Sequence, residues 1–279
     1  MVTPSIVLGG LDLNTTEAET GVLWAADPIR GWQGPSSSIS VARKPRAHGG
    51  WAGSAFMLPR HMTIRGSVLA PTEEALTDAL DRLNVAASLA DTALTVTEAA
   101  GARSCTVRRE DEVLAPLITP LLAEFSVQLV APDPRKYGAP LSGSTALPSS
   151  TGGLTVPFTV PFSINAVTVS GQVSLMNMGN VTGPVSLRID GPVTGPVVTH
   201  VGTGRALVFA SSLVLGAGEF VTVDMERREV LAQGQSSRSG WVTSRGWSGF
   251  QPGGNVWSFS AQAYDASSLL TVNATPAWE

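Results

Sequence analysis

Histidine and cysteine, the residues that most often bind metals or act as nucleophiles, are scarce in this sequence. The histidines are His48, His61 and His200, and Cys105 is the single cysteine. Their spacing fits no helical or hairpin ligand pair, and a protein metal site needs three or four ligands. Cys105 lies in an alternating, strand-like segment, where a cysteine is usually a small buried hydrophobe. We therefore expect no metal site, no cofactor, no disulfide framework and no catalytic thiol.

The serine, acidic and glycine residues also lack a catalytic arrangement. No Gly-x-Ser-x-Gly sequence marks a nucleophile elbow. Asp190 lies in an Asp-Gly-Pro turn sequence, and Asp224 and Glu226 flank a hairpin tip, so turn formation explains these acids better than a glycosidase pair. The sequences 202–205 and 216–219 lack the lysine and the following helix of a phosphate-binding loop. The sequence predicts that the protein is not an enzyme.

Tryptophans near the C-terminal end are the candidate contact residues. Trp257 lies in an alternating segment and is expected in the core, whereas Trp241 and Trp247 lie with Arg245 in a stretch rich in Ser, Gly and Arg. An exposed tryptophan can stack on a sugar or fill a protein interface. We expect Trp241, Arg245 and Trp247 to contact a protein or a glycan.

Charge argues against a nucleic-acid partner, and the lack of a long apolar run argues against insertion into a membrane. The chain has 279 residues, a net charge of −4 and only 14% charged residues, and an acidic chain is poorly suited to a phosphate backbone. The basic cluster at residues 43–46 is expected to be a solvated loop. No apolar run approaches the roughly 18 residues of a membrane span, and the first ten residues do not resemble a signal peptide.

Composition divides the chain into two domains. Residues 1–137 carry 12 Lys/Arg and 15 Asp/Glu, whereas residues 138–279 carry only 6 and 7. The segment 138–153 is dense in Gly, Ser, Thr and Pro, a composition typical of a linker. The sequence predicts domains at 1–137 and 154–279, joined by a linker at 138–153.

The predicted elements differ between the two halves. Thr72 can cap a helix that runs to about Leu89, because Leu76, Leu80 and Leu83 recur at helical spacing. Strand-like runs surround this helix at 62–68, 94–97, 104–109 and 125–130, which indicates an α+β domain. The second half has no convincing helix and predicts an antiparallel β-sandwich or barrel. Its expected strands are Phe158–Ile164, Ala166–Val169, Val173–Met176, Val185–Ile189, Val197–Val201, Ala206–Val214, Glu219–Asp224, Glu229–Ala232, Val256–Ala263 and Leu269–Val272.

The order of these features resembles the distal tail proteins of long-tailed siphophages, also called phage tail component or minor tail proteins. The Asn-x-Gly-Asn and Ile-x-Gly-Pro sequences are the most specific part of the likeness, and the Trp-rich stretch after residue 235 is similar to versions from phages of actinobacterial hosts. The residues that carry the resemblance are Val127–Tyr137, Gly152–Phe158, Asn177–Asn180, Ile189–Pro192 and Leu215–Asp224.

The resemblance implies a structural role in the virion. Family members form a hexameric ring at the tail tip, between the tail tube protein and the tail-tip hub protein. The first domain makes the ring, and the second, a galectin-like β-sandwich, lies at its periphery and often holds receptor-binding or fibre proteins. The resemblance supplies no catalytic residues, and it implies synthesis in the cytoplasm of the bacterial host. The alternative is a carbohydrate-binding β-sandwich module that contacts the host surface.

Overall fold

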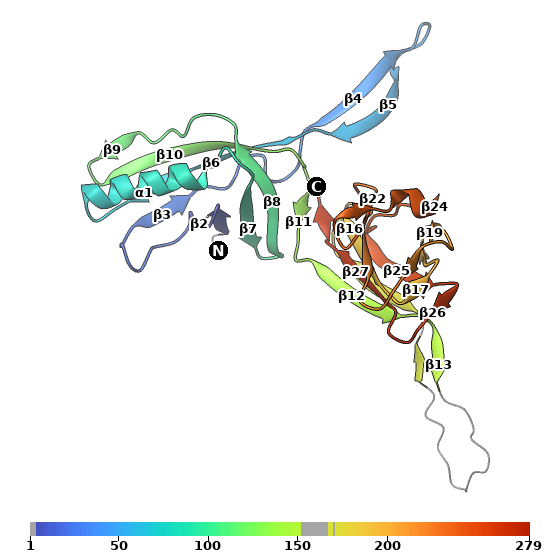
Figure 1. Cartoon of the computed structure of the whole chain (residues 1–279). Coiled ribbons are helices and arrows are strands. Elements are labelled where there is room, and N and C mark those ends of the chain that lie inside the picture. Colours follow the sequence, from blue (N-terminus) through green and yellow to red (C-terminus); the bar gives the residue numbers. More distant parts are fainter. Residues whose placement is uncertain (1–3, 152–166, 170) are drawn as a thin grey trace, which may run out of the picture. The chain divides into compact units, whose positions relative to one another are not determined.

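The computed structural model describes residues 4–151, 167–169 and 171–279. The chain forms two compact units, Met1–Gly138 and Ala139–Trp278, which are coloured blue to green and green to red in Figure 1. In the described part of the chain, no helix has the length and apolar character needed to span a membrane.

The first unit is an antiparallel sheet covered by a helix. Its strands lie in the order β2-β1-β7-β8-β10-β6-β3, β9 pairs with β10, β11 pairs with β8, and β4 and β5 form a separate two-stranded sheet. The elements are β1 (Ser5–Leu8), β2 (Leu11–Asp12), β3 (Leu23–Ala26), β4 (Ser37–Arg43), β5 (Gly50–Met57), β6 (Arg60–Leu69), α1 (Glu73–Ala86), β7 (Thr92–Glu98), β8 (Gly101–Arg109), β9 (Leu117–Thr119), β10 (Leu122–Ala131) and β11 (Lys136–Tyr137).

Helix α1 begins where the sequence predicts. The Thr72 side chain accepts a hydrogen bond from the Ala75 amide at 3.1 Å, and two acids occupy the first turn, near the positive end of the helix dipole. Leu76 and Leu83 are buried against the sheet. The helix ends at Ala86, three residues before the predicted end.

Strands β6 and β10 form the centre of the first unit. They pair along their whole lengths, from Leu122 opposite Leu69 to Ala131 opposite Arg60. Alternate residues of both strands are buried, among them Ile64 and Val127, so one face of the pair meets α1 and the other faces outward. The predicted α+β fold is therefore confirmed.

The second unit is built from short antiparallel strands. One sheet has the order β12-β27-β16-β21-β22-β23, another β15-β25-β18-β19-β24, and smaller sheets are β20-β17-β26 and β13-β14. The elements are β12 (Leu141–Ala146), β13 (Ser149–Thr151), β14 (Val167–Val169), β15 (Gln172–Asn177), β16 (Val185–Asp190), β17 (Val193–Thr194), β18 (Val197–His200), β19 (Arg205–Phe209), β20 (Val214–Leu215), β21 (Phe220–Asp224), β22 (Glu229–Ala232), β23 (Ser236–Ser237), the 3-10 helix η1 (Ser239–Trp241), β24 (Val242–Arg245), β25 (Gly253–Ser260), β26 (Ala263–Tyr264), β27 (Leu269–Ala274) and β28 (Ala277–Trp278).

The two larger sheets share one hydrophobic core. Leu187 and Val223 come from the first of them, and Trp257 and Phe259 come from the second. Trp257 is completely buried, as the alternation around it predicts. Fully burying a phenylalanine side chain such as that of Phe259 contributes roughly 1.5–3 kcal/mol. The predicted antiparallel β-sandwich is confirmed, although the predicted strand 158–164 lies outside the described residues.

The predicted linker is wrong for residues 141–146 and 149–151, which form β12 and β13. Residues Leu141–Ala146 form β12, which pairs with β27 from Leu141 opposite Ala274 to Ala146 opposite Leu269. Small residues are needed there because a Cβ on Gly143 would approach Val173 Cγ1 to 2.7 Å. The composition that resembles a linker is therefore the composition of a closely packed edge strand. Residues 152 and 153 of the predicted linker lie outside the described residues.

The Asn-x-Gly-Asn sequence has a structural role. Asn177 is buried, and its side-chain nitrogen donates to the carbonyl of Phe250 at 2.7 Å while its oxygen accepts from the Gly179 amide at 2.7 Å. A Cβ on Gly179 would collide with the Ala277 backbone. The motif therefore fixes a turn against two other segments of the second unit.

Candidate functional site

The thiol of Cys105 is buried and unreactive as a nucleophile. Burial raises the pKa of its thiol to about 11, although the charges of Arg60 and Lys136 oppose this shift. The thiolate is the nucleophilic form, and at neutral pH this group stays a thiol. Cys105 therefore contributes to packing, as the sequence predicts.

The histidines do not come together. His200 is buried, its Nδ1 lies 2.8 Å from Thr203 Oγ1, and its Nε2 lies 3.0 Å from Asn255 Oδ1. Asn255 Oδ1 also accepts from the backbone amide of Gln251, so His200 Nε2 donates to this oxygen. His61 is exposed instead, and its Nδ1 atom lies 2.7 Å from a carboxylate oxygen of Glu110. His48 is exposed in the turn between β4 and β5.

The acidic residues act in turns and ion pairs. Asp190 binds the guanidinium of Arg188 at 2.7 Å. Asp224 accepts hydrogen bonds from the backbone amides of Glu226 and Arg227 at 2.9 Å, as a turn-capping residue does. Within the residues that the structure describes, no group of three or more His, Cys, Asp or Glu side chains could hold a metal ion.

The predicted contact residues have different environments. Trp241 ends η1 and is 37% exposed, with the guanidinium of Arg238 4.5 Å above its ring. Trp247 packs against the core of the second unit, and its carbonyl accepts from Arg205 at 2.9 Å. Arg245 is exposed at the end of β24. Trp241 and Arg245 are therefore accessible, whereas the Trp247 ring faces inward.

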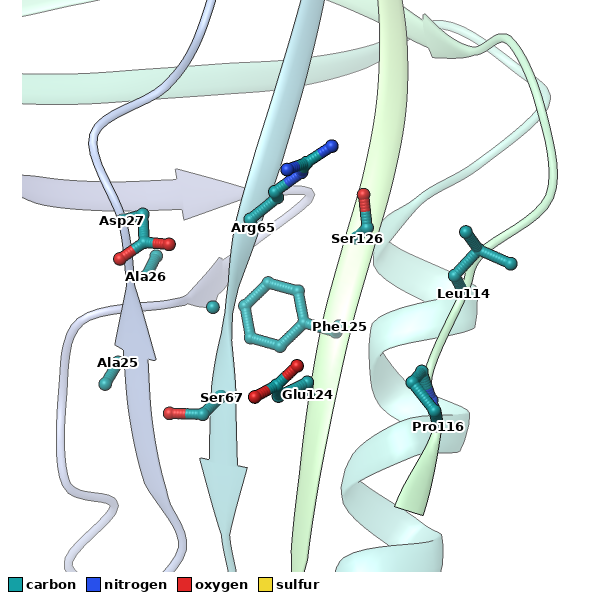
Figure 2. Close-up of a pocket in the computed structure, with 11 residues that line it drawn as sticks. Ala25, Ala26, Asp27, Arg65, Ser67, Leu114, Pro116, Glu124, Phe125 and Ser126 are labelled. Atoms are coloured by element: carbon teal, nitrogen blue, oxygen red, sulfur yellow. The ribbon is translucent and has the colours of Figure 1, made fainter. Parts of the chain in front are cut away.

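A groove crosses the outer face of β3, β6 and β10. Figure 2 shows the Phe125 ring between the side chains of Asp27, Arg65 and Glu124. The recess has a volume of about 590 Å³, and Gly66 is among its lining residues. A Cβ there would collide with the Ala25 carbonyl and approach Phe125 Cζ to 2.7 Å. The groove is open and carries both charge signs, so it suits contact with another surface.

Strands β4 and β5 form a hairpin, here called the arm (residues 37–57), that extends away from the sheet of the first unit (Figure 1). Apart from Gly50, every residue of both strands is exposed. Among the described strands, β4 and β5 pair only with each other. A two-stranded hairpin alone is marginally stable in water. The sequence shows no strong signal for this arm, because Ser, Gly and Ala dilute its alternation.

Both faces of the arm carry large apolar side chains. Trp51 pairs with Ala42 and Phe56 pairs with Ser38, which places the two aromatic rings on one face. Ile39 and the other odd-numbered residues of β4 lie on the opposite face. Trp51 is 59% exposed and Phe56 is 69% exposed. Exposed apolar residues on both faces of an unpaired hairpin are typical of an interaction surface.

Two buried cations fix both ends of the arm. Arg60, directly after the arm, donates to the carbonyls of Trp32 at 2.7 Å and Pro134 at 2.7 Å. Lys136 Nζ donates to the carbonyls of Trp32 and Gln33, both at 3.1 Å. Burial lowers the pKa of Lys136 to about 8. These bonds hold the segment that leads into β4 against the one that leaves β5.

Comparison with known proteins gives a match of fold. No family model matches the chain, and no curated protein matches it in sequence. Among solved structures, the SPP1 Dit (gp 19.1) protein aligns over 100% of both chains, with a TM-score of 0.69 and 13% identity. The chain has the Dit fold. That structure is described as a paradigm of the hub adsorption apparatus in phages that infect Gram-positive bacteria.

A second solved structure supports the Dit fold. A chain of the phage P2 baseplate, in its activated conformation with Ca, aligns over 98% of each chain with a TM-score of 0.52 and 9% identity. At such identities the likeness is one of fold. The resemblance to distal tail proteins that the sequence predicts is confirmed at this level.

Proposed function

We propose that the chain is a distal tail protein, a structural component of a phage tail tip. It joins the tail tube to the tail-tip hub and anchors receptor-binding or fibre proteins. The observation that carries this proposal is the alignment of the whole chain, both units in order, with the SPP1 Dit protein. The protein acts in the virion after synthesis in the host cytoplasm, and its role is structural rather than catalytic.

The ring is a hexamer built by the first unit. A closed ring requires two different surfaces on each subunit, since a patch that binds its own copy stops at a dimer. The arm supplies one such surface, because its apolar side chains are exposed on both faces in the single chain. The second unit lies at the periphery and holds the attached proteins.

The predicted contact residues of the second unit suit a protein partner better than a glycan. A sugar stacks on a free aromatic face, but Arg238 lies over one face of Trp241 and Trp247 packs into the core. We assign Trp241 and Arg245 to the surface that holds a receptor-binding or fibre protein.

Imaging of intact phage tails that contain this protein tests the proposal. The expected result is six-fold density directly below the tail tube, labelled by an antibody against the chain. Label on the tail tube or on the capsid, with none at the tip, would contradict the role. Hydrolysis of peptidoglycan or a host glycan by the purified chain, abolished in a folded point variant, would contradict a purely structural role.

A further inference from the structure

A second apolar surface of the first unit lies between α1 and β9. A groove of about 750 Å³ runs there, with Leu80 and Pro120 among its apolar lining residues and Glu73 and Asp81 among its polar ones. Leu117 and Ile118 are 64% and 55% exposed. Leucine and isoleucine with this exposure at the edge of a sheet are typical of a surface that another chain covers.

The groove is acidic. Helix α1 carries four acids and one arginine, and that residue, Arg82, forms an ion pair with Glu17 at 2.7 Å. No lysine or arginine occurs from residue 110 to residue 134, the range that contains β9. The apolar edge of β9 is therefore next to a helix with uncompensated negative charge.

The arm has the opposite charge. Its tip contains Arg43, Lys44 and Arg46, and no Asp or Glu occurs from residue 31 to residue 59. The arm thus combines exposed aromatic rings with a basic tip, and the groove combines exposed aliphatic side chains with acids. The two surfaces are complementary in both polarity and charge.

The arm of a chain points away from that chain's own groove. The arm joins β6 at Arg60, whereas α1 follows the other end of β6 at Leu69. A ten-residue strand separates these ends by about 30 Å. Figure 1 shows the arm extending from the end of β6 opposite α1, within the first unit. A second copy is therefore the suitable occupant.

We propose that the arm of one copy docks in the α1–β9 groove of the next copy. This inference rests on the proposed ring and names its two surfaces. Trp51 and Phe56 cover Leu117 and Ile118, while the basic tip lies along the acids of α1. Each copy offers one arm and one groove, so the contact is head-to-tail and continues until the ring closes.

Charge reversal in the full-length protein tests the contact. The arm variant is Lys44→Glu with Arg46→Glu, and the groove variant is Glu73→Lys with Asp81→Lys. Each variant alone should assemble about tenfold more weakly in light scattering, because reversed exposed charge pairs repel. A mixture of the two should recover assembly, since every arm then meets a groove of opposite charge. Arg227→Glu, at a hairpin tip of the second unit, is the matched control and should change nothing.

Cross-linking identifies which surfaces meet. Phe56→Cys and Ile118→Cys are made in separate full-length chains, mixed, and treated with a short bismaleimide. The expected product is a covalent dimer that forms only in the mixture, and the doubly substituted chain should give a ladder of oligomers. Cys105 is buried and does not compete. Val201→Cys, exposed in the second unit, replaces Ile118→Cys in the control and should give no dimer.

Three results would overturn the inference. They are dimers of Phe56→Cys alone, cross-links within single doubly substituted chains, and unchanged assembly of both charge variants. If the wild-type chain still forms a ring in these cases, the proposed function stands and only the arm–groove contact fails. If the wild-type chain forms no assembly in solution or on tails, the ring itself fails.

Discussion

Replacing Phe56 with serine should weaken assembly much more than folding. Phe56 leaves 69% of its surface exposed in the single chain. Fully burying a phenylalanine side chain is worth about 1.5–3 kcal/mol, so covering the exposed part is worth roughly 1–2 kcal/mol per contact. The substitution removes this contribution from the free energy of assembly, but it changes the free energy of folding little. We expect the free energy of unfolding of the monomer to fall by less than about 1 kcal/mol.

The effect on a closed ring is larger than on one contact. A ring of six chains contains six contacts, and its formation reduces six independent particles to one. The half-assembly concentration, at which half of the chains are in rings, therefore varies as the six-fifths power of the dissociation constant of one contact. A loss of roughly 1–2 kcal/mol per contact therefore raises this concentration by roughly 8- to 60-fold. Light scattering over a dilution series measures the shift, and urea denaturation measures the folded stability.

The control for Phe56→Ser is Met178→Ser, at an exposed apolar residue of the second unit. It should leave both the assembly and the stability unchanged. An unaltered half-assembly concentration for Phe56→Ser would refute the assignment of the arm to an interface. A loss of several kcal/mol in unfolding free energy would show instead that Phe56 belongs to the core of the folded monomer.

Three further predictions concern the first unit. Burial lowers the pKa of Lys136 to about 8 from an ordinary 10.5. Between these two pH values Lys136 is protonated in the unfolded chain but not in the folded one, so the free energy of unfolding rises with pH. The variant Lys136→Met should show a smaller rise when unfolding by urea is measured at several pH values. If the unfolding free energies of the wild-type chain and of Lys136→Met changed equally with pH, this prediction would be contradicted. Gly66→Ala should lower the free energy of unfolding by about 1–3 kcal/mol, because the new Cβ collides with the Ala25 carbonyl. The control Gly240→Ala has open space at its Cβ position and should leave this free energy nearly unchanged. Equal stabilities of the two variants would contradict the prediction. Cys105, with its pKa raised to about 11, should resist thiol reagents at neutral pH until urea unfolds the chain, and rapid labelling of the folded protein would exclude this environment.

The sequence predicts the fold class well because its signals are local. Thr72 and the leucine spacing that follows mark α1, and alternation marks strands such as β16 and β21. The sandwich follows from turns that recur between such strands. These features depend on residues close in sequence, so periodicity alone identifies them.

The predicted linker shows where composition misleads. Ser, Thr and Gly in 141–146 resemble a flexible connection, but β12 pairs with β27 more than 120 residues later. Gly143 is small because Val173 lies against it. A long-range packing demand of this kind has no local signature.

The candidate interface is harder to predict than the fold. Trp51 and Phe56 resemble core residues in sequence, and their exposure follows from the absence of a third strand beside β4 and β5 among the described residues. The basic cluster 43–46 is interpreted as a solvated loop until the arm that presents it is known. The basic arm and the acidic helix α1 can be recognised as complementary surfaces only when the structure shows where each of them lies.

The mass of the full-length protein in solution tests the central claim most directly. Six chains of 28.9 kDa give about 173 kDa, and light scattering over a concentration series should show the monomer giving way to this mass, with a six-fold ring in images of the same sample. A stable dimer or trimer that persists at every concentration would contradict the account, because such a species leaves no open head-to-tail surface from which a six-membered ring can close.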